Sequence, residues 1–209
     1  MKHDIKPDFN HFNPKLLLNP ERKKNENPEK IIPIQYLKNK VVADFGCGSG
    51  FYSNYIKKFA LKLYCIDPSK NLLDAAKKYI KLNNKNKKIL FINSKISDVA
   101  IPFKSVDTGL LANVFHDIDP NLRKKSIKKI KQILKHDGIL IVVEWKKVKT
   151  ESGPPYKLRI DEKKCISYFI DLKFKIIKKF NVGAQQYCLI LKNSIKINKN
   201  NHDARNSKK

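Results

Sequence analysis

Two apolar runs, each ending in an acidic residue and joined through a glycine-rich turn, constrain the fold of this chain more than any other feature. The first run, 41–45, leads into glycines at alternate positions (46, 48 and 50), and the second run, 61–66, ends at Asp67. Glycine permits a tight turn whose backbone N–H groups touch a ligand closely. An acid about 20 residues further on, at the tip of the next strand, suits a grip on ribose hydroxyls. The pattern predicts two buried strands around a helix, with a nucleoside-bearing ligand at their carboxyl ends.

The rest of the chain continues the alternation of strands and helices. Strict alternation predicts a parallel, doubly wound α/β sheet with right-handed crossovers. Two final apolar runs predict a hairpin that adds an antiparallel strand. His136-Asp137-Gly138 is expected to end the helix over 120–134 with a glycine after its last turn. The expected strands are 40–45, 61–66, 89–92, 106–112, 139–144, 174–180 and 187–191; the expected helices are 51–59, one from 67–69 to at least 80, 120–134 and 161–172, after short N-terminal helices near 14–18 and 29–37.

Length and composition indicate one domain with loose ends. The chain has 209 residues, of which 41% are hydrophobic, enough for an ordinary core. No apolar run approaches the ~20 residues that span a bilayer, and the N-terminus lacks the apolar region of a secretory signal. We expect a soluble cytoplasmic protein and leave its oligomeric state open. The expected divisions are an N-terminal helical lid segment (1–39), a ligand-binding domain (40–192) and a disordered basic tail (193–209).

The four cysteines, at positions 47, 65, 165 and 188, show no Cys-x-x-Cys spacing and no pairing with histidine. Metal sites and disulfide frameworks need closer or patterned spacing. We therefore expect small buried hydrophobic residues at these positions, and no metal site.

The net charge of +26 leaves two interpretations open. A strongly basic chain favours nucleic-acid binding, but lysine, asparagine and isoleucine are used heavily everywhere, as a bias towards AT-rich codons would produce. In the most basic run, 123–131, apolar residues keep helical spacing, so the lysines form either a solvated face or a face for a polyanion. No aromatic residues interleave these lysines in sequence, as a platform for single-stranded nucleic acid requires.

The acid before the glycine turn discriminates between nucleoside ligands. Dinucleotide sites use Gly-x-Gly-x-x-Gly and place a pyrophosphate at a helix N-terminus. Here the spacing is Gly-x-Gly-x-Gly, and Asp44 lies two residues before the first glycine. A carboxylate is unfavourable beside a pyrophosphate and favourable beside an ammonium group. S-adenosylmethionine, which carries an ammonium, a sulfonium and no phosphate, fits this acid.

The stretch from Asp44 to Gly50 resembles the first motif of the class I S-adenosylmethionine-dependent methyltransferases, Asp/Glu-x-Gly-x-Gly-x-Gly, and 110–118 resembles their fourth motif. The resemblance covers roughly 10–192 and implies a Rossmann-like, mostly parallel seven-stranded sheet with an antiparallel C-terminal hairpin strand. Further motifs resemble small prokaryotic methyltransferases related to the ubiquinone/menaquinone and arsenite enzymes: His11-Phe12-Asn13-Pro14, Pro20-Glu21-Arg22, Glu144-Trp145-Lys146, and Gly153-Pro154-Pro155 with Arg159.

The resemblance also implies roles at the cofactor site. The glycine turn approaches the methionine part, Asp67 takes the ribose hydroxyls, and backbone carbonyls after strand four accept from the ammonium. Asp98 would receive the adenine amino group, although Ser97 stands at the commoner family spacing and Asp98 reads equally well as a loop or cap residue. The implied cofactor-binding residues are Asp44, Gly46, Cys47, Gly48, Gly50, Asp67, Pro68, Asp98, Ala112 and Asn113.

The expected reaction is in-line methyl transfer to a small-molecule acceptor. His116 and Glu144 are candidate catalytic residues that serve only if the acceptor must lose a proton; the alternative for His116 is packing. Two other functions stay open, an RNA methyltransferase that uses the basic surface and a non-catalytic cofactor-binding subunit. Gly153-Pro154-Pro155-Tyr156 is similar to the motif of base-amine methyltransferases but follows strand five, whereas that motif must follow strand four.

Two segments remain to cover the acceptor, the N-terminal one and the loop after strand five. Both carry prolines beside aromatic or basic groups, and aromatic faces near a sulfonium stabilise its charge. Arg159 is expected to hold an anionic group of the substrate; alternatively it pairs locally in a loop stiffened by prolines. The predicted substrate-pocket residues are His11, Phe12, Trp145, Tyr156 and Arg159.

Overall fold

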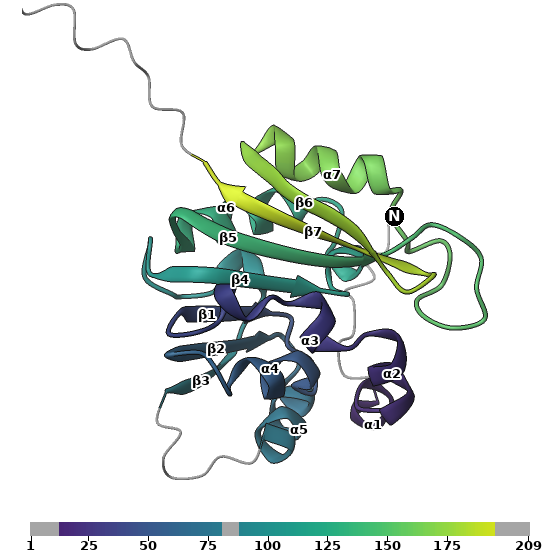
Figure 1. The fold of residues 1–209 in the computed structure, drawn as a ribbon, viewed down its shortest axis with the longest axis horizontal. Helices are drawn as coiled ribbons and strands as arrows, with labels where there is room; N and C mark the ends of the chain where they lie inside the picture. Colours follow the sequence, from purple (N-terminus) through teal and green to yellow (C-terminus); the bar gives the residue numbers. More distant parts are fainter. Residues whose placement is uncertain (1–12, 81–87, 195–209) are drawn as a thin grey trace, which may run out of the picture.

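The computed structural model describes residues 13–80 and 88–194, which fold around a seven-stranded sheet (Figure 1). The strand order is β3-β2-β1-β4-β5-β7-β6. β1 to β5 pair in parallel, whereas β7 runs antiparallel to β5 and β6. The predicted doubly wound sheet with its antiparallel hairpin is therefore confirmed. The strands are β1 Val41–Phe45, β2 Lys62–Asp67, β3 Ile89–Asn93, β4 Val106–Ala112, β5 Leu134–Trp145, β6 Phe174–Val182 and β7 Gln186–Asn193.

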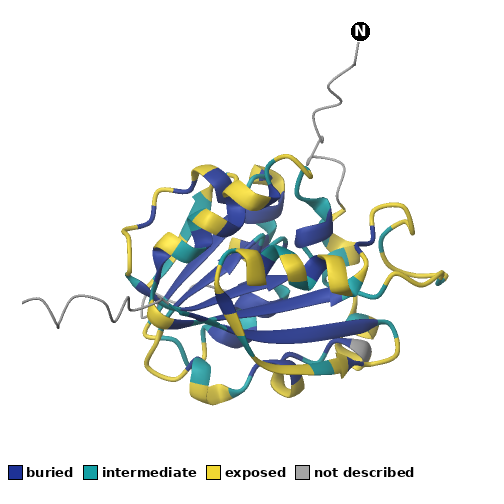
Figure 2. Cartoon of the chain, turned by 90° about the horizontal axis from the view of Figure 1, so that it is seen from above, coloured by how far each residue is buried: buried dark blue, intermediate teal, exposed yellow. Residues whose placement is uncertain are grey.

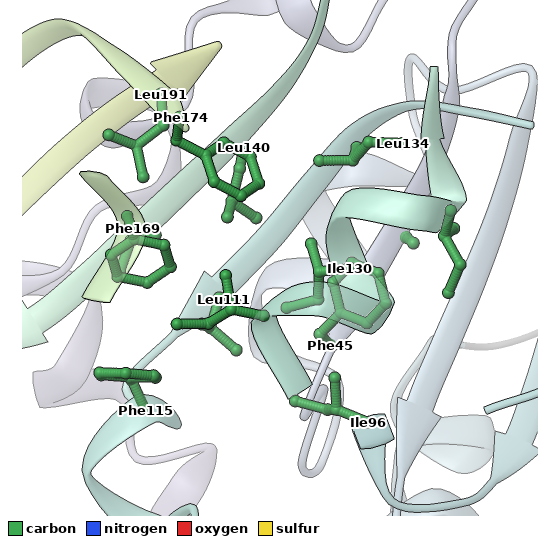
Figure 3. Close-up of a cluster of buried hydrophobic side chains, with 14 of the residues drawn as sticks. Phe45, Ile96, Leu111, Phe115, Ile130, Leu134, Leu140, Phe169, Phe174 and Leu191 are labelled. Atoms are coloured by element: carbon green, nitrogen blue, oxygen red, sulfur yellow. The ribbon is translucent and has the colours of Figure 1, made fainter. Parts of the chain in front are cut away.

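Helices cover both faces of the sheet, and each face has its own apolar core. One core packs α3 to α5 against the sheet, and the other packs α6 and α7. Figure 2 shows strands buried beneath helices whose outer surfaces are exposed, and Figure 3 shows the second core, where aromatic and aliphatic side chains point towards one another. The helices that cover the sheet after β1 are α4 Phe51–Ile56, α5 Lys70–Ile80, α6 Arg123–Ile133 and α7 Glu162–Asp171; the 3-10 turns are η2 Ile34–Tyr36, η3 Ile96–Asp98 and η4 Phe115–Asp117.

Three short helices precede the sheet: α1 Pro14–Leu17, α2 Pro20–Asn25 and α3 Pro28–Ile31. Each begins at an Asn-Pro pair, in which the asparagine side chain accepts from a backbone N–H of the first turn. Asparagine is a strong N-cap, and proline is favoured at the first helical position. α2 is not among the helices expected from the sequence, although its cap pair, Asn19-Pro20, is a usable signal.

The end of α6 differs from the prediction. The helix ends at Ile133, and β5 begins at Leu134, five residues earlier than expected. Leu134 has an extended backbone (φ −64°, ψ 136°), and its side chain is buried in the core. It pairs with Val106, so its backbone belongs to the sheet and not to the helix. The residue with positive φ is Asp137 (φ 59°), not Gly138. The predicted glycine cap at Gly138 is therefore wrong.

Candidate functional site

The glycine turn after β1 lies at the point where the strand order reverses, between β1 and β4. Ligands of open α/β sheets bind at such a point. Its glycines all have positive φ, +77° at Gly46, +53° at Gly48 and +87° at Gly50. A Cβ atom on Gly46 would lie 2.4 Å from Cγ2 of Val114, which belongs to the loop after β4. Two loops therefore meet at Gly46, and only glycine leaves room for both.

The backbone N–H groups of this turn are used inside the protein. Those of Gly46 and Cys47 donate to the carbonyl oxygen of Ile66, at 2.7 and 2.9 Å. That of Gly48 donates to Asp67 Oδ2 at 2.9 Å. The expected contact between N–H groups and ligand is therefore not available at these three positions. A pyrophosphate needs such donors, so the turn does not suit a dinucleotide, and the acids beside it favour a cationic ligand.

Asp44 is buried beneath the turn, and Ser53 Oγ of α4 donates to its Oδ2 at 2.6 Å. Burial raises the pKa of Asp44 to about 7; the Ser53 hydrogen bond opposes the rise, Asp67 adds to it, and Arg22 opposes it. A carboxyl group with this pKa is partly protonated at neutral pH. A ligand cation beside it would favour the ionised form.

Asp67 is the last residue of β2, and one of its carboxylate oxygens binds the glycine turn. Oδ1 accepts from the Ser69 N–H and Oδ2 from the Gly48 N–H, each at 2.9 Å. A carboxylate has about four acceptor positions, so two remain for hydroxyl donors. Burial raises its pKa against the effect of these two hydrogen bonds. The next residue, Pro68, has its carbonyl oxygen bound by Asn93 Nδ2 at 2.9 Å, which fixes the start of the following turn.

Asp98 lies on η3, and its side chain binds a lysine of α6. Its Oδ1 forms an ion pair with Lys125 at 2.8 Å, and its Oδ2 accepts from Ser97 Oγ at 3.0 Å. The hydrogen bond from Lys125, followed by that from Ser97, lowers the pKa of this exposed carboxyl group. Its predicted contact with adenine stays a prediction.

Asn113 follows Ala112, the last residue of β4, in a left-handed conformation (φ +58°), and belongs to a closed ring of three side chains. Its Nδ2 donates to Glu26 Oε2 at 2.9 Å. Gln186 Nε2 donates to Asn113 Oδ1 at 2.9 Å and to Glu26 Oε1 at 3.1 Å. Glu26 and Gln186 are 5% and 2% exposed. The ring joins the N-terminal segment, β4 and β7.

Two more side chains bind the Glu26 carboxylate. Arg22 approaches Oε2 through both Nε and Nη2 at 3.0 Å, and Tyr52 donates its hydroxyl at 3.1 Å. The Arg22 guanidinium also stacks 4.4 Å from the ring centroid of Phe51. Sequence reasoning missed Glu26, Tyr52 and Gln186, because Glu26 stands in a run of charged residues that resembles a solvated surface. Only the Pro20-Glu21-Arg22 motif hinted at this contact.

The two predicted catalytic residues, His116 and Glu144, are in contact at the carboxyl ends of β4 and β5. His116 Nδ1 lies 3.0 Å from both carboxylate oxygens, and its Nε2 lies 3.5 Å from Asp117 Oδ1. The Trp145 N–H also donates to Glu144, at 2.9 Å. Burial disfavours a charged imidazole, but Glu144 and Asp117 together outweigh burial, so the pKa of His116 is raised. Glu144 therefore orients the ring and stabilises its protonated form.

Arg159 holds together the loop between β5 and α7. The side chain is 3% exposed, and its guanidinium lies 5.1 Å from the Trp145 ring centroid. Four of the five N–H donors of this arginine are used within the loop, so one donor remains for a substrate anion. Of the two alternatives from the sequence, the structure shows local pairing. The acceptors, at 2.5–2.9 Å, are the carbonyl oxygens of Val148, Ser152 and Pro154 and the hydroxyl of Thr150.

Of the other predicted substrate-pocket residues, Trp145 and Tyr156 are described by the structure. Trp145 packs under Gly153 (φ +88°), where a Cβ atom would lie 2.6 Å from its ring. Tyr156 is 47% exposed on the same loop. His11 and Phe12 lie outside the described residues.

Three other expectations concern the described part of the chain. All four cysteines are buried and free of disulfides, as predicted. Within 13–80 and 88–194, no group of three His, Cys, Asp or Glu side chains is arranged to hold a metal ion. Over the same residues, no helix combines the length and the hydropathy needed to cross a membrane.

Comparison with known proteins connects this geometry to a family. Residues 43–142 match the family model described as "Methyltransferase domain". A methyltransferase from Aquifex aeolicus, described as dependent on S-adenosylmethionine, is 26% identical, covers 87% of this chain and 98% of its own, and superposes with a TM-score of 0.77. A putative type 11 methyltransferase from Sulfolobus solfataricus is 36% identical, with 85% and 98% coverage and a TM-score of 0.71.

Among curated proteins, the ribosomal RNA small subunit methyltransferase A of Mesomycoplasma hyopneumoniae (strain J) is 31% identical over 116 residues. This match covers 56% of the chain and 42% of the relative. The chain spans less than half the length of the curated relatives that it matches.

Proposed function

Because the chain belongs to the class I S-adenosylmethionine-dependent methyltransferases, we propose that it methylates a small-molecule acceptor at the carboxyl ends of β1, β4 and β5. When bound, S-adenosylmethionine supplies an electrophilic methyl group on a sulfonium. The protein's part is then to align the acceptor with that group and to exclude water.

The charges and the unused hydrogen-bonding positions around the glycine turn fit this cofactor. Asp67 keeps acceptor capacity for the ribose hydroxyls, and Asp44 gives the turn a negative charge that an ammonium would stabilise. Ser49 Oγ, in the same turn, is buried and has no hydrogen-bond partner among the described residues, which leaves a polar group for a ligand. The backbone carbonyls of Ala112 and Asn113 would accept from the ammonium.

The observation that supports the small-molecule proposal is that two anchored segments lie at the carboxyl end of the sheet (Figure 1). The N-terminal helices are attached to β4 and β7 through the buried Glu26 carboxylate. The loop after β5 is held rigid by Arg159. Figure 1 shows both segments at the end of the sheet towards which the β4 arrow points. Segments fixed in this position would cover an acceptor only if it is small.

A second candidate function, RNA methylation, is favoured by the relative that acts on ribosomal RNA and by the net charge of +26. The site gives it less support. The residues after β4 are Asn113 and Val114, with no proline pair to stack on a base, and Gly153-Pro154-Pro155-Tyr156 lies after β5. We therefore place RNA second.

His116 serves the reaction only if the acceptor loses a proton. Glu144 holds Nδ1, so Nε2 is the ring nitrogen through which a proton would be exchanged. Because the pKa of His116 is raised, the neutral ring that accepts a proton gains population as the pH rises. The rate would then increase with pH through that pKa, and His116→Gln would remove the dependence.

The test is incubation of the protein with cofactor labelled in its methyl group and with cell extract separated into small-molecule and RNA fractions. We expect label in the small-molecule fraction. Label in RNA would support the second candidate, and cofactor binding without transfer in either fraction would indicate a non-catalytic subunit. A variant such as Asp67→Ala, which removes the ribose acceptor, is the control for transfer at this site.

A further inference from the structure

The carboxylate of Glu26 collects donors from four parts of the chain. Oε2 accepts from Arg22, Tyr52 and Asn113, and Oε1 accepts from Gln186, at 2.9–3.1 Å. These donors lie on α2, on α4, after β4 and at the start of β7, and Gln186 is 160 residues from Glu26 in the sequence. A buried carboxylate is tolerated when donors of this kind surround it. The arrangement therefore specifies one position for the N-terminal segment.

Within the N-terminal segment, residues 13–32 carry the three short helices and depend on such contacts for their position. These helices contain four, six and four residues, and helices of this length are not stable alone. Ile31 and Ile32 fix the end of this stretch in the apolar core. Further towards the N-terminus, Arg22 donates through Nη1 to the carbonyl oxygen of Leu17 at 3.0 Å. The Glu26 carboxylate thus links the buried end of the segment to its outer part.

Both loops that form the cofactor site touch this segment. Asn113, whose amide binds Glu26, precedes Val114, and Val114 packs against Gly46 of the glycine turn. Leu17 Cδ1 lies 3.2 Å from where a Cβ atom on Gly48 would be. Loss of the Glu26 carboxylate would therefore remove a hydrogen-bond acceptor from both the Asn113 amide and the Arg22 guanidinium.

We propose that Glu26 is a positioning residue for methyl transfer, which couples docking of the N-terminal segment to completion of the cofactor site through Asn113. The proposal rests on the proposed function in that both concern this one site, but it does not depend on the identity of the acceptor. Glu26 acts without contacting the cofactor: it fixes the loop after β4 and closes the segment over the glycine turn. Cofactor binding and segment docking should therefore stabilise each other.

The first test compares cofactor affinity in Glu26→Gln and in a matched control. The substitution keeps the shape but turns an oxygen acceptor into an amide donor that faces other donors. We expect the dissociation constant for S-adenosylmethionine, measured by calorimetry, to rise about tenfold, within the usual range of coupling between sites. The control is Glu21→Gln on the same helix, whose side chain is 65% exposed in a pair with Lys24. It should bind as the wild type does.

The second test asks whether the ring itself is responsible. In the exchange variant Glu26→Gln/Gln186→Glu a carboxylate returns to the ring from β7, and we expect part of the lost affinity to return. Trypsin reports docking independently, because Lys23, Lys24 and Lys30 are exposed on the segment. S-adenosylhomocysteine should slow cleavage there in the wild type and in Glu21→Gln, but not in Glu26→Gln.

Two outcomes would overturn the proposal: Glu26→Gln binding the cofactor within about twofold of the wild type, or the same ligand-dependent protection in that variant. If Glu26→Gln does not fold, Tyr52→Phe removes one donor and keeps the ring, and unchanged affinity and protection in it would also overturn the proposal. None of these measurements needs an acceptor. Methylation of RNA by the wild type would contradict the small-molecule proposal and leave this one standing.

Discussion

At the scale of single residues, the proposed cofactor site contains two carboxyl groups that the fold removes from water, those of Asp44 and Asp67. Burial raises the pKa of Asp44 to about 7, although Ser53 Oγ donates to it. The Asp44 carboxyl group is therefore only partly ionised at neutral pH. A bound cation would complete its ionisation and release a proton.

The first prediction concerns cofactor affinity and pH. As the pH rises from 6 to 8, Asp44 ionises and the affinity for S-adenosylmethionine should increase, by up to about tenfold per pH unit below its pKa. In Asp44→Asn the affinity should be weaker and nearly independent of pH. Calorimetry in buffers with different ionisation enthalpies measures both the affinity and the protons released. An equal pH dependence in both proteins would show that another group is responsible.

The second prediction concerns stability. The folded pKa of Asp44 lies above its ordinary value of 3.8, so between these values the folded state holds a proton that the unfolded state has lost. Stability from this group is fully present at low pH and is lost as the pH rises from about 4 to above 7, by up to about 4 kcal/mol. His116, whose pKa is also raised, adds a loss in the same direction above pH 6.5. Urea unfolding at pH 5 and 8 should show this decrease, and Asp44→Asn should reduce it.

The third prediction concerns Gly46. Alanine there would adopt a positive φ and would place its Cβ atom 2.4 Å from Val114. Gly46→Ala should destabilise the fold by about 1–3 kcal/mol and weaken cofactor binding. Because a smaller side chain at 114 removes the clash but not the backbone strain, Val114→Ala should recover part of the loss. Thermal unfolding of both single variants and the double variant measures this coupling, and strictly additive effects would contradict the contact.

At the scale of elements, local signals predicted the strands better than the ends of the helices. Four of the strands, β1, β2, β4 and β7, are mostly buried runs, whereas Leu134 is apolar enough for either α6 or β5 and its partner Val106 decides. The Asn-Pro pairs show that the N-terminal helices had local signals too. What no local pattern reveals is a contact such as Glu26 with Gln186, since the two lie on elements that only the complete sheet brings together.

The fourth prediction concerns the loop after β5. Arg159→Lys keeps the charge but loses the planar fork that serves four acceptors, and should cost about 1–3 kcal/mol of stability. Trypsin should then cleave faster at the exposed Lys147 and Lys149. A raised KM for the acceptor without loss of thermal stability would instead indicate the anion-binding role predicted from the sequence.

At the scale of the whole molecule, the net charge of +26 is the feature that bears most directly on the choice between the two candidate acceptors. α6 buries Ile127, Ile130 and Ile133 and exposes lysines on its outer face, which both alternatives from the sequence, a solvated face and a face for a polyanion, require. One detail was not visible in sequence: Phe103, 67% exposed, lies 5.7 Å from the Lys129 ammonium, so an aromatic ring does accompany these lysines in space. An isolated pair of this kind stabilises by only about 0.5–1 kcal/mol and is not a stacking platform.

The fifth prediction uses this charge to separate the two candidate acceptors. An RNA that contacts six to ten phosphates would lose about 10³–10⁵ in affinity between 50 and 200 mM salt, because each contact releases counterions. A small acceptor enclosed at the ends of β4 and β5 makes few such contacts, so its kcat/KM should change less than about threefold over that range. Since Lys128 is exposed on the outer face of α6, Lys128→Glu should leave turnover of a small acceptor unchanged. A steep salt dependence of turnover, together with loss of activity in Lys128→Glu, would show instead that the basic surface recognises the acceptor.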